Sequence, residues 1–122
     1  GAQSVLGVDA SETAVLQARR NASLNGLDGT VKFLCEDVFE LLPELEEKGE
    51  KFDVVVLDPP AFTKSSSTVK NAERGYKEIN MKAMKLLPRG GYLATCSCSH
   101  FMTEERFLRL LRVHRSGSEE CP

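Results

Sequence analysis

Residues 52–60 read FDVVVLDPP, and this stretch decides the fold class. Four consecutive apolar residues with no polar alternation predict a strand over residues 52–57 that is covered on both faces, as in the middle of a parallel sheet. The strand has to stop at Asp58 because two successive prolines cannot donate to a sheet ladder. A central strand that ends at an acidic residue is typical of α/β proteins, whose ligands bind beyond the carboxyl ends of the strands.

Similar pairs of strand and helix surround this stretch, four in all. The expected strands are residues 4–9, 31–35, 52–57 and 92–98, and the expected helices are residues 12–24, 38–48, 71–87 and a last helix from Thr103. Ser11 is the expected N-cap of the first helix, and Pro43 predicts an irregular start of the second. Short β-branched runs that alternate with amphipathic stretches predict an α/β fold, a parallel sheet sandwich of four βα units.

Length and composition fit one small globular domain. The chain has 122 residues, of which 41% are hydrophobic and 28% charged, and its formal net charge is −2. We expect one partial domain over residues 1–115 and a frayed tail over residues 116–122. The near-neutral charge gives no overall basic footprint for nucleic acid, so any RNA contact has to be local or made by sequence outside the chain.

The expected location is the cytoplasm. No window approaches about 20 uninterrupted apolar residues, so a membrane span is not expected. The four cysteines follow no signal peptide and are interpreted as free thiols. Because the chain opens on Gly1-Ala2-Gln3, without an initiator Met, we expect it to be a piece of a longer protein.

Four candidate site residues lie at the ends of the four strands or one or two residues beyond them: Asp9, Asp37, Asp58 and Cys98. The carboxylate of Asp9 could accept both hydroxyl protons of a ribose, and the carboxylate of Asp37 could accept from an exocyclic amine. Each could equally be a helix cap. The sequence leaves both alternatives open.

The segment DPPAF, residues 58–62, is a candidate platform for a planar base. Its prolines keep the backbone extended, and Phe62 could stack on the base while Asp58 accepts from a base amine. Alternatively, the strand ends in a proline turn and Phe62 returns to the core. Lys64 lies in a polar loop over residues 63–70, which suits phosphates but could also be a solvated linker.

Cys98 is a candidate nucleophile, with a small buried core cysteine as the alternative. It shares a strand face with Cys96, two residues earlier. A zinc site is not expected, because Cys96, Cys98 and His100 lack the usual spacing of ligand pairs and no second pair exists in the chain.

Five motifs occur in the order found in one known family. They are residues 8–11 (VDAS), 20–26 (RNASLNG), 58–62 (DPPAF), 75–80 (GYKEIN) and 90–100 (GGYLATCSCSH). Together they resemble the class I S-adenosylmethionine-dependent methyltransferases, which have a Rossmann-like sheet. The closest resemblance is to the family that makes 5-methylcytosine in large-subunit ribosomal RNA and carries a PUA-type RNA-binding domain.

The resemblance implies roles for the site residues by position. Asp9 with Ala10 would bind the ribose of S-adenosylmethionine, and Asp37 with Val38 would bind the adenine. Asp58, which also borders the cofactor, would line the pocket of the target base together with the substrate-binding residues Pro59, Pro60, Phe62 and Lys64. Cys98 would be the nucleophile. Related enzymes use a second cysteine after the proline pair for product release, but here that position reads Ala61-Phe62.

The resemblance also implies parts that the chain lacks. A first strand with a glycine-rich loop does not precede residue 4, and in the family that strand is central. We therefore expect the isolated chain to bind S-adenosylmethionine poorly, and to close the central gap by re-pairing its strands or by forming a homodimer with strand exchange. Contacts to ribosomal RNA would come mostly from the RNA-binding domain.

Two other functions fit the same residues. An amino-group methyltransferase acting on RNA or protein also uses an Asp-Pro-Pro-Phe-like motif but needs no thiol. A non-catalytic nucleotide-binding or assembly module would use the cysteines only as core residues.

Overall fold

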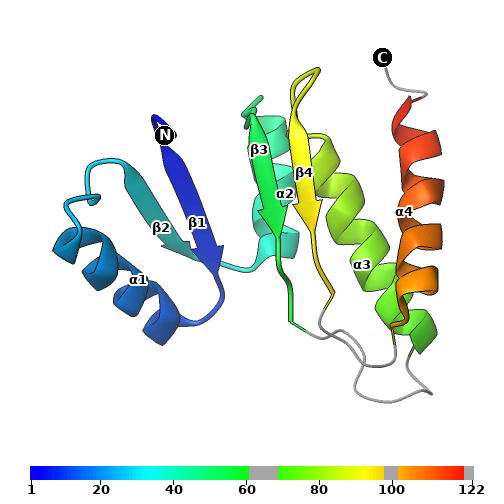
Figure 1. Cartoon of the computed structure of the whole chain (residues 1–122), viewed down its shortest axis with the longest axis horizontal. Helices are drawn as coiled ribbons and strands as arrows, with labels where there is room; N and C mark the ends of the chain where they lie inside the picture. Colours follow the sequence, from blue (N-terminus) through cyan, green and yellow to red (C-terminus); the bar gives the residue numbers. More distant parts are fainter. Residues whose placement is uncertain (61–68, 98–101, 120–122) are drawn as a thin grey trace. The chain divides into compact units, whose positions relative to one another are not determined.

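The computed structural model describes residues 1–60, 69–97 and 102–119, and within them four strands alternate with four helices (Figure 1). In chain order these are β1 (Val5–Asp9), α1 (Glu12–Leu24), β2 (Val31–Cys35), α2 (Val38–Glu47), β3 (Val54–Leu57), α3 (Val69–Met84), β4 (Tyr92–Thr95) and α4 (Glu104–Glu119). The predicted α/β class with four βα units is confirmed.

The chain divides into two compact units, Gly1–Leu41 and Leu42–Pro122. Each unit has its own two-stranded parallel sheet, β1–β2 in the first and β3–β4 in the second. A single domain was expected, whose strands would either re-pair across the missing central position or associate with a second copy. Among the residues that the structure describes, that re-pairing does not occur.

The first unit packs α1 against the β1–β2 sheet. The strands pair in register from Val5 opposite Val31 to Asp9 opposite Cys35. Arg19 on α1 donates to the carbonyl oxygen of Phe33 at 2.9 Å, which ties the helix to β2. Ser11 caps α1, as predicted, because its hydroxyl oxygen accepts from the amide of Ala14.

At Gly7 on β1 there is room for a hydrogen atom on the Cα atom but not for a side chain. A Cβ atom at this position would lie 2.6 Å from Cδ1 of Phe33, the residue directly opposite on β2. We therefore expect Gly7→Ala to lower the free energy of unfolding by about 1–3 kcal/mol, the usual cost of overpacking. Gly29→Ala is the control, because a Cβ there meets nothing within 4 Å. Urea unfolding of both variants tests this, and equal stabilities would contradict it.

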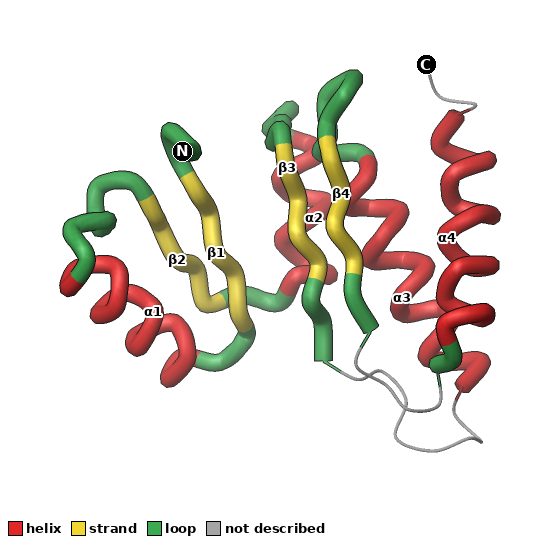
Figure 2. Tube along the Cα trace, in the orientation of Figure 1, coloured by secondary structure: helices red, strands yellow, loops and turns green. Residues whose placement is uncertain are grey.

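The second unit has a core between α3, α4 and the β3–β4 sheet. Its fully buried side chains include Tyr76, Ala83 and Leu86 of the α3 region, at 0–2% exposed. Helices α3 and α4 lie side by side (Figure 2), and the ring of Tyr76 meets that of Phe107 edge-on with centroids 5.8 Å apart. Met102 and Leu110 extend this cluster.

The β3–β4 sheet has one exposed face. Val54 is 59% and Val56 is 66% exposed, whereas Leu57 on the opposite face is 6% exposed. The expectation that this strand is covered on both faces is therefore wrong for this chain. Successive side chains of a strand point to opposite faces, so burial on one side leaves the alternate valines in solvent.

Several element boundaries differ from those expected. Helix α3 begins two residues earlier than residue 71 and ends at Met84, and β4 ends at Thr95 instead of residue 98. Helix α2 is continuous through Pro43, where an irregular start was expected. Helix α4 continues to Glu119, through residues expected to be a frayed tail. None of the described helices is long and apolar enough to cross a membrane.

Candidate functional site

The first unit brings Asp9 and Asp37 to one edge of its sheet. Asp9 ends β1 opposite Cys35, the last residue of β2, and the amide of Glu36 donates to the carbonyl oxygen of Asp9 at 3.1 Å. Asp37 is the next residue along the chain. The two carboxylates expected at the cofactor are thus neighbours at the carboxyl edge of β1 and β2.

Both carboxylates also accept a hydrogen bond from an amide two residues further along the chain. Oδ1 of Asp9 accepts from the amide of Ser11 at 2.8 Å, and Oδ1 of Asp37 accepts from the amide of Phe39 at 2.9 Å. The N-cap of α1 is Ser11, two residues after Asp9, so the capping alternative is confirmed for Asp37 alone. These hydrogen bonds do not exclude ligand binding, because both residues are exposed and their Oδ2 atoms make no hydrogen bond within the described part of the chain.

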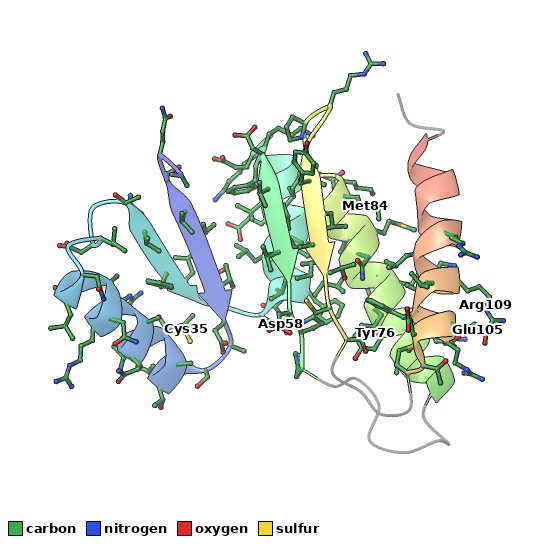
Figure 3. All side chains as sticks on the ribbon, viewed as in Figure 1. Cys35, Asp58, Tyr76, Met84, Glu105 and Arg109 are labelled. Carbon is green, nitrogen blue, oxygen red and sulfur yellow. The ribbon has the colours of Figure 1, made fainter. Side chains whose placement is uncertain are left out.

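The neighbours of these carboxylates complete the edge. Ala10 is exposed directly after Asp9, and Val38 is half-buried at the first turn of α2. The thiol of Cys35 lies 3.6 Å from the carbonyl oxygen of Ala10 and is free and exposed (Figure 3). The sequence interpretation did not assign Cys35 to the site, although its position at the end of the second strand is the signal that places it there.

The second unit holds Asp58 at the carboxyl edge of its own sheet. The amide of Cys96 donates to the carbonyl oxygen of Leu57 at 2.9 Å, so the chain after β4 leaves beside Asp58. The Asp58 side chain is exposed, Pro59 is buried and Pro60 is exposed. Within residues 58–60, Asp58 and Pro60 are therefore the residues that solvent reaches.

Two hydroxyl side chains lie at or just after the end of β4, at the carboxyl edge of this sheet. Oγ1 of Thr95 and Oγ of Ser97 are buried and have no hydrogen-bond partner among the residues that the structure describes, while Cys96 between them is exposed. Buried polar atoms without partners are uncommon in proteins. The residues just before Cys98 therefore carry unused hydrogen-bonding capacity.

Three of the predicted site residues lie outside the described residues: Cys98, Phe62 and Lys64. Their roles stay predictions from the sequence. Within residues 1–60, 69–97 and 102–119, no group of three His, Cys, Asp or Glu side chains is placed to hold a metal ion.

Comparison with protein families matches residues 1–121 to a family described as a methyltransferase domain. Over 112 residues the chain is 53% identical to ribosomal RNA large subunit methyltransferase I of Aeromonas salmonicida. It is 46% identical over the same length to the protein of that name from Escherichia coli O139:H28. Each alignment covers 91% of this chain and 28% of the relative, so the chain spans less than a third of these relatives.

Two solved structures share the fold at low sequence identity. SMU.776 complexed with SAH superposes with a TM-score of 0.78 and 19% identity, over 92% of this chain and 30% of that one. The SAM-dependent methyltransferase from Agrobacterium tumefaciens gives a TM-score of 0.61 and 21% identity, over 87% and 36% of the two chains.

Proposed function

The chain belongs to the methyltransferase-domain family, and from this premise we propose that it is part of an RNA methyltransferase that uses S-adenosylmethionine. The proposed reaction transfers a methyl group to C5 of a cytosine in large-subunit ribosomal RNA. The observation that carries the proposal is the 53% identity, over 91% of this chain, to a protein named ribosomal RNA large subunit methyltransferase I. The chain that contains the motifs at residues 58–62 and 90–100 also has the fold of SMU.776, the methyltransferase-like structure described above.

The carboxyl edge of β1 and β2 suits an adenosine. A ribose diol needs an acceptor with a free oxygen, and the exocyclic amine of adenine needs a second one a few ångströms further. The free Oδ2 atoms of Asp9 and Asp37 supply these acceptors, with Ala10 and Val38 beside them. S-adenosylmethionine contributes an electrophilic methyl group when bound, and the hydrogen bonds from the amides of Ser11 and Phe39 orient the carboxylates that would hold it.

The edge of β3 and β4 would take the target base. Asp58 is exposed there and can hydrogen-bond to the base. By the family resemblance, Pro60 and Phe62 would contact the base and Lys64 a phosphate. The base has to leave its stack to reach such a pocket. Cys98 supplies the nucleophile in this proposal.

We expect the isolated 122 residues to bind the cofactor weakly. They include no glycine-rich loop before β1, and β1 and β3 each pair on one edge within the described residues. Unpaired strand edges accept further strands. A strand from the rest of the protein, or from a second copy by strand exchange, would complete the sheet.

We expect cofactor binding to depend on the negative charge of Asp9 more than on that of Asp37. In a longer protein that contains this chain, we expect Asp9→Asn to weaken S-adenosylhomocysteine binding by about 10- to 100-fold, because hydrogen bonds to a charged group contribute about 1.5–3 kcal/mol. Asp37→Asn should weaken binding less than about tenfold, because an amide oxygen still accepts from the adenine amine. Isothermal titration calorimetry measures both, and a stronger effect at residue 37 would reverse the assigned roles.

Mass analysis of the modified nucleoside tests the proposed reaction. Large-subunit ribosomal RNA from cells lacking the longer protein is incubated with that protein and labelled S-adenosylmethionine, then digested to nucleosides. Label in 5-methylcytidine supports the proposal. Label in an amino-methylated nucleoside would identify an amino-group methyltransferase instead, and no label with intact cofactor binding would favour a non-catalytic module.

A further inference from the structure

The net charge of −2 conceals a strong asymmetry along the sequence. Residues 61–122 contain 11 of the 16 Lys and Arg residues but only 6 of the 18 Asp and Glu residues. The first 60 residues hold the remaining 5 basic and 12 acidic ones. A charge difference of this kind between the two halves of a chain is a sign of contact with a polyanion.

Helices α3 and α4 carry most of the positive charge of the second half. They are packed together by the contact of Tyr76 with Phe107 and by an ion pair between Arg106 and Glu73, with Nη1 and Oε1 3.0 Å apart. Figure 3 shows Arg109 and Glu105 on the outer side of α4, away from Tyr76. The charged side chains of α3 and α4 are therefore carried by two helices that are packed against each other.

The acidic residues of α3 are occupied, whereas three cations of the pair are not. Glu78 binds Lys82 at 2.7 Å and Glu73 binds Arg106. The exposed side chains of Arg74, Lys77 and Arg109 make no hydrogen bond or ion pair with any residue in the described ranges. Exposed cations without protein partners are the groups that neutralise phosphates at nucleic-acid interfaces.

We propose that the exposed cations Arg74 and Lys77 of α3 and Arg109 of α4 bind the phosphate backbone of the RNA substrate. This inference rests on the proposed function, because a ribosomal RNA substrate makes RNA the polyanion that such a surface meets. Arginine and lysine contacts to phosphate position a nucleic acid without reading its sequence. The pair would hold RNA that flanks the target cytosine.

Binding of a fluorescein-labelled 20-nucleotide single-stranded RNA to the 122-residue chain, followed by fluorescence anisotropy at several salt concentrations, tests the surface. We expect the triple variant Arg74→Gln/Lys77→Gln/Arg109→Gln to weaken binding about tenfold or more at low salt. The slope of log K against log salt should fall in magnitude by about 2, because each lost phosphate contact on single strands contributes about 0.7.

The control is a second triple variant that also loses three positive charges, at positions outside α3 and α4. Arg20, Lys32 and Arg89 are exposed and unpaired within the described structure, but none lies on α3 or α4. Arg20→Gln/Lys32→Gln/Arg89→Gln should change RNA affinity less than twofold. Equal weakening by both variants would overturn the proposal in favour of net charge alone, and unchanged binding by the first would remove the surface from the interface.

Two further readouts separate this proposal from its alternatives. Circular dichroism has to show that both variants are folded, which is expected because all six side chains are exposed. Competition by poly-glutamate as strong as by unlabelled RNA would indicate an acidic protein partner and overturn the RNA assignment. RNA binding is measured without cofactor and does not depend on the reaction. A protein that binds RNA but does not methylate it would count against the proposed reaction and not against the RNA-binding surface.

Discussion

Methyl transfer to cytosine is expected to fall by at least about a thousandfold when Cys98 is replaced by alanine in a longer protein that contains this chain, because covalent catalysis by an activated thiol has no substitute at this position. Binding of S-adenosylhomocysteine should change less than twofold, since the proposed adenosine contacts come from Asp9 and Asp37. Single-turnover methylation of ribosomal RNA and calorimetry measure the two quantities.

The expected loss follows from the chemistry of cytosine. C5 is a poor nucleophile until a thiolate adds to C6, which turns the C5–C6 bond into an enamine-like system. C5 then attacks the methyl carbon in line, and the sulfonium leaves as a neutral thioether. A base takes the proton from C5, and the C6–sulfur bond breaks to return the thiolate and the aromatic ring. Without the sulfur, the first bond does not form.

Cys96 is the matched control, two residues away on the same segment. It is free and exposed, so Cys96→Ala removes a thiol without opening a core cavity and should retain more than half of the activity. RNA containing 5-fluorocytidine should form a covalent complex with the wild-type protein and with Cys96→Ala, because fluorine blocks loss of the C5 proton. Trapping or methylation by Cys98→Ala would contradict the assigned nucleophile.

The sequence predicted the fold where local signals and tertiary packing agree. Helix α1 and strand β2 occur with the expected boundaries, since a serine cap, an apolar face and the turn at Gly26 all act within a few residues. The polar residues at Asp9, Asp37 and Asp58 follow their strands as expected. Such positions are predictable because a strand ending before a polar residue is a local event.

The sequence could not predict features that depend on distant parts of the chain. An unbroken run of valines indicates a strand buried on both faces, yet Val54 and Val56 are exposed because burial needs a second layer, which the run itself does not supply. At Asp9, a backbone contact and a ligand contact were treated as alternatives, although one side chain can make both. A carboxylate has two oxygens: Oδ1 of Asp9 accepts from the amide of Ser11, and Oδ2 makes no hydrogen bond with the described residues.

The second largest effect is expected at Asp58. Addition of a thiolate at C6 places negative charge on the base, and a carboxylic acid that donates its proton to N3 neutralises that charge as it develops. Asp58 is exposed and directly follows Leu57, which is 6% exposed at the end of β3. The buried leucine therefore fixes the strand while the carboxyl group stays available to a substrate.

We expect Asp58→Ala, in the longer protein, to lower kcat for RNA methylation by about 10²–10⁴-fold, the range for loss of a proton-transferring or charge-stabilising side chain. The change in kcat should exceed the change in KM for RNA, because the interaction strengthens as the thiolate adds. Asp53→Ala is the control: Asp53 is exposed just before the same strand, so it removes equal charge away from the carboxyl edge. A loss confined to KM, or an equal loss in both variants, would show that Asp58 holds the substrate or the fold and does not take part in the addition step.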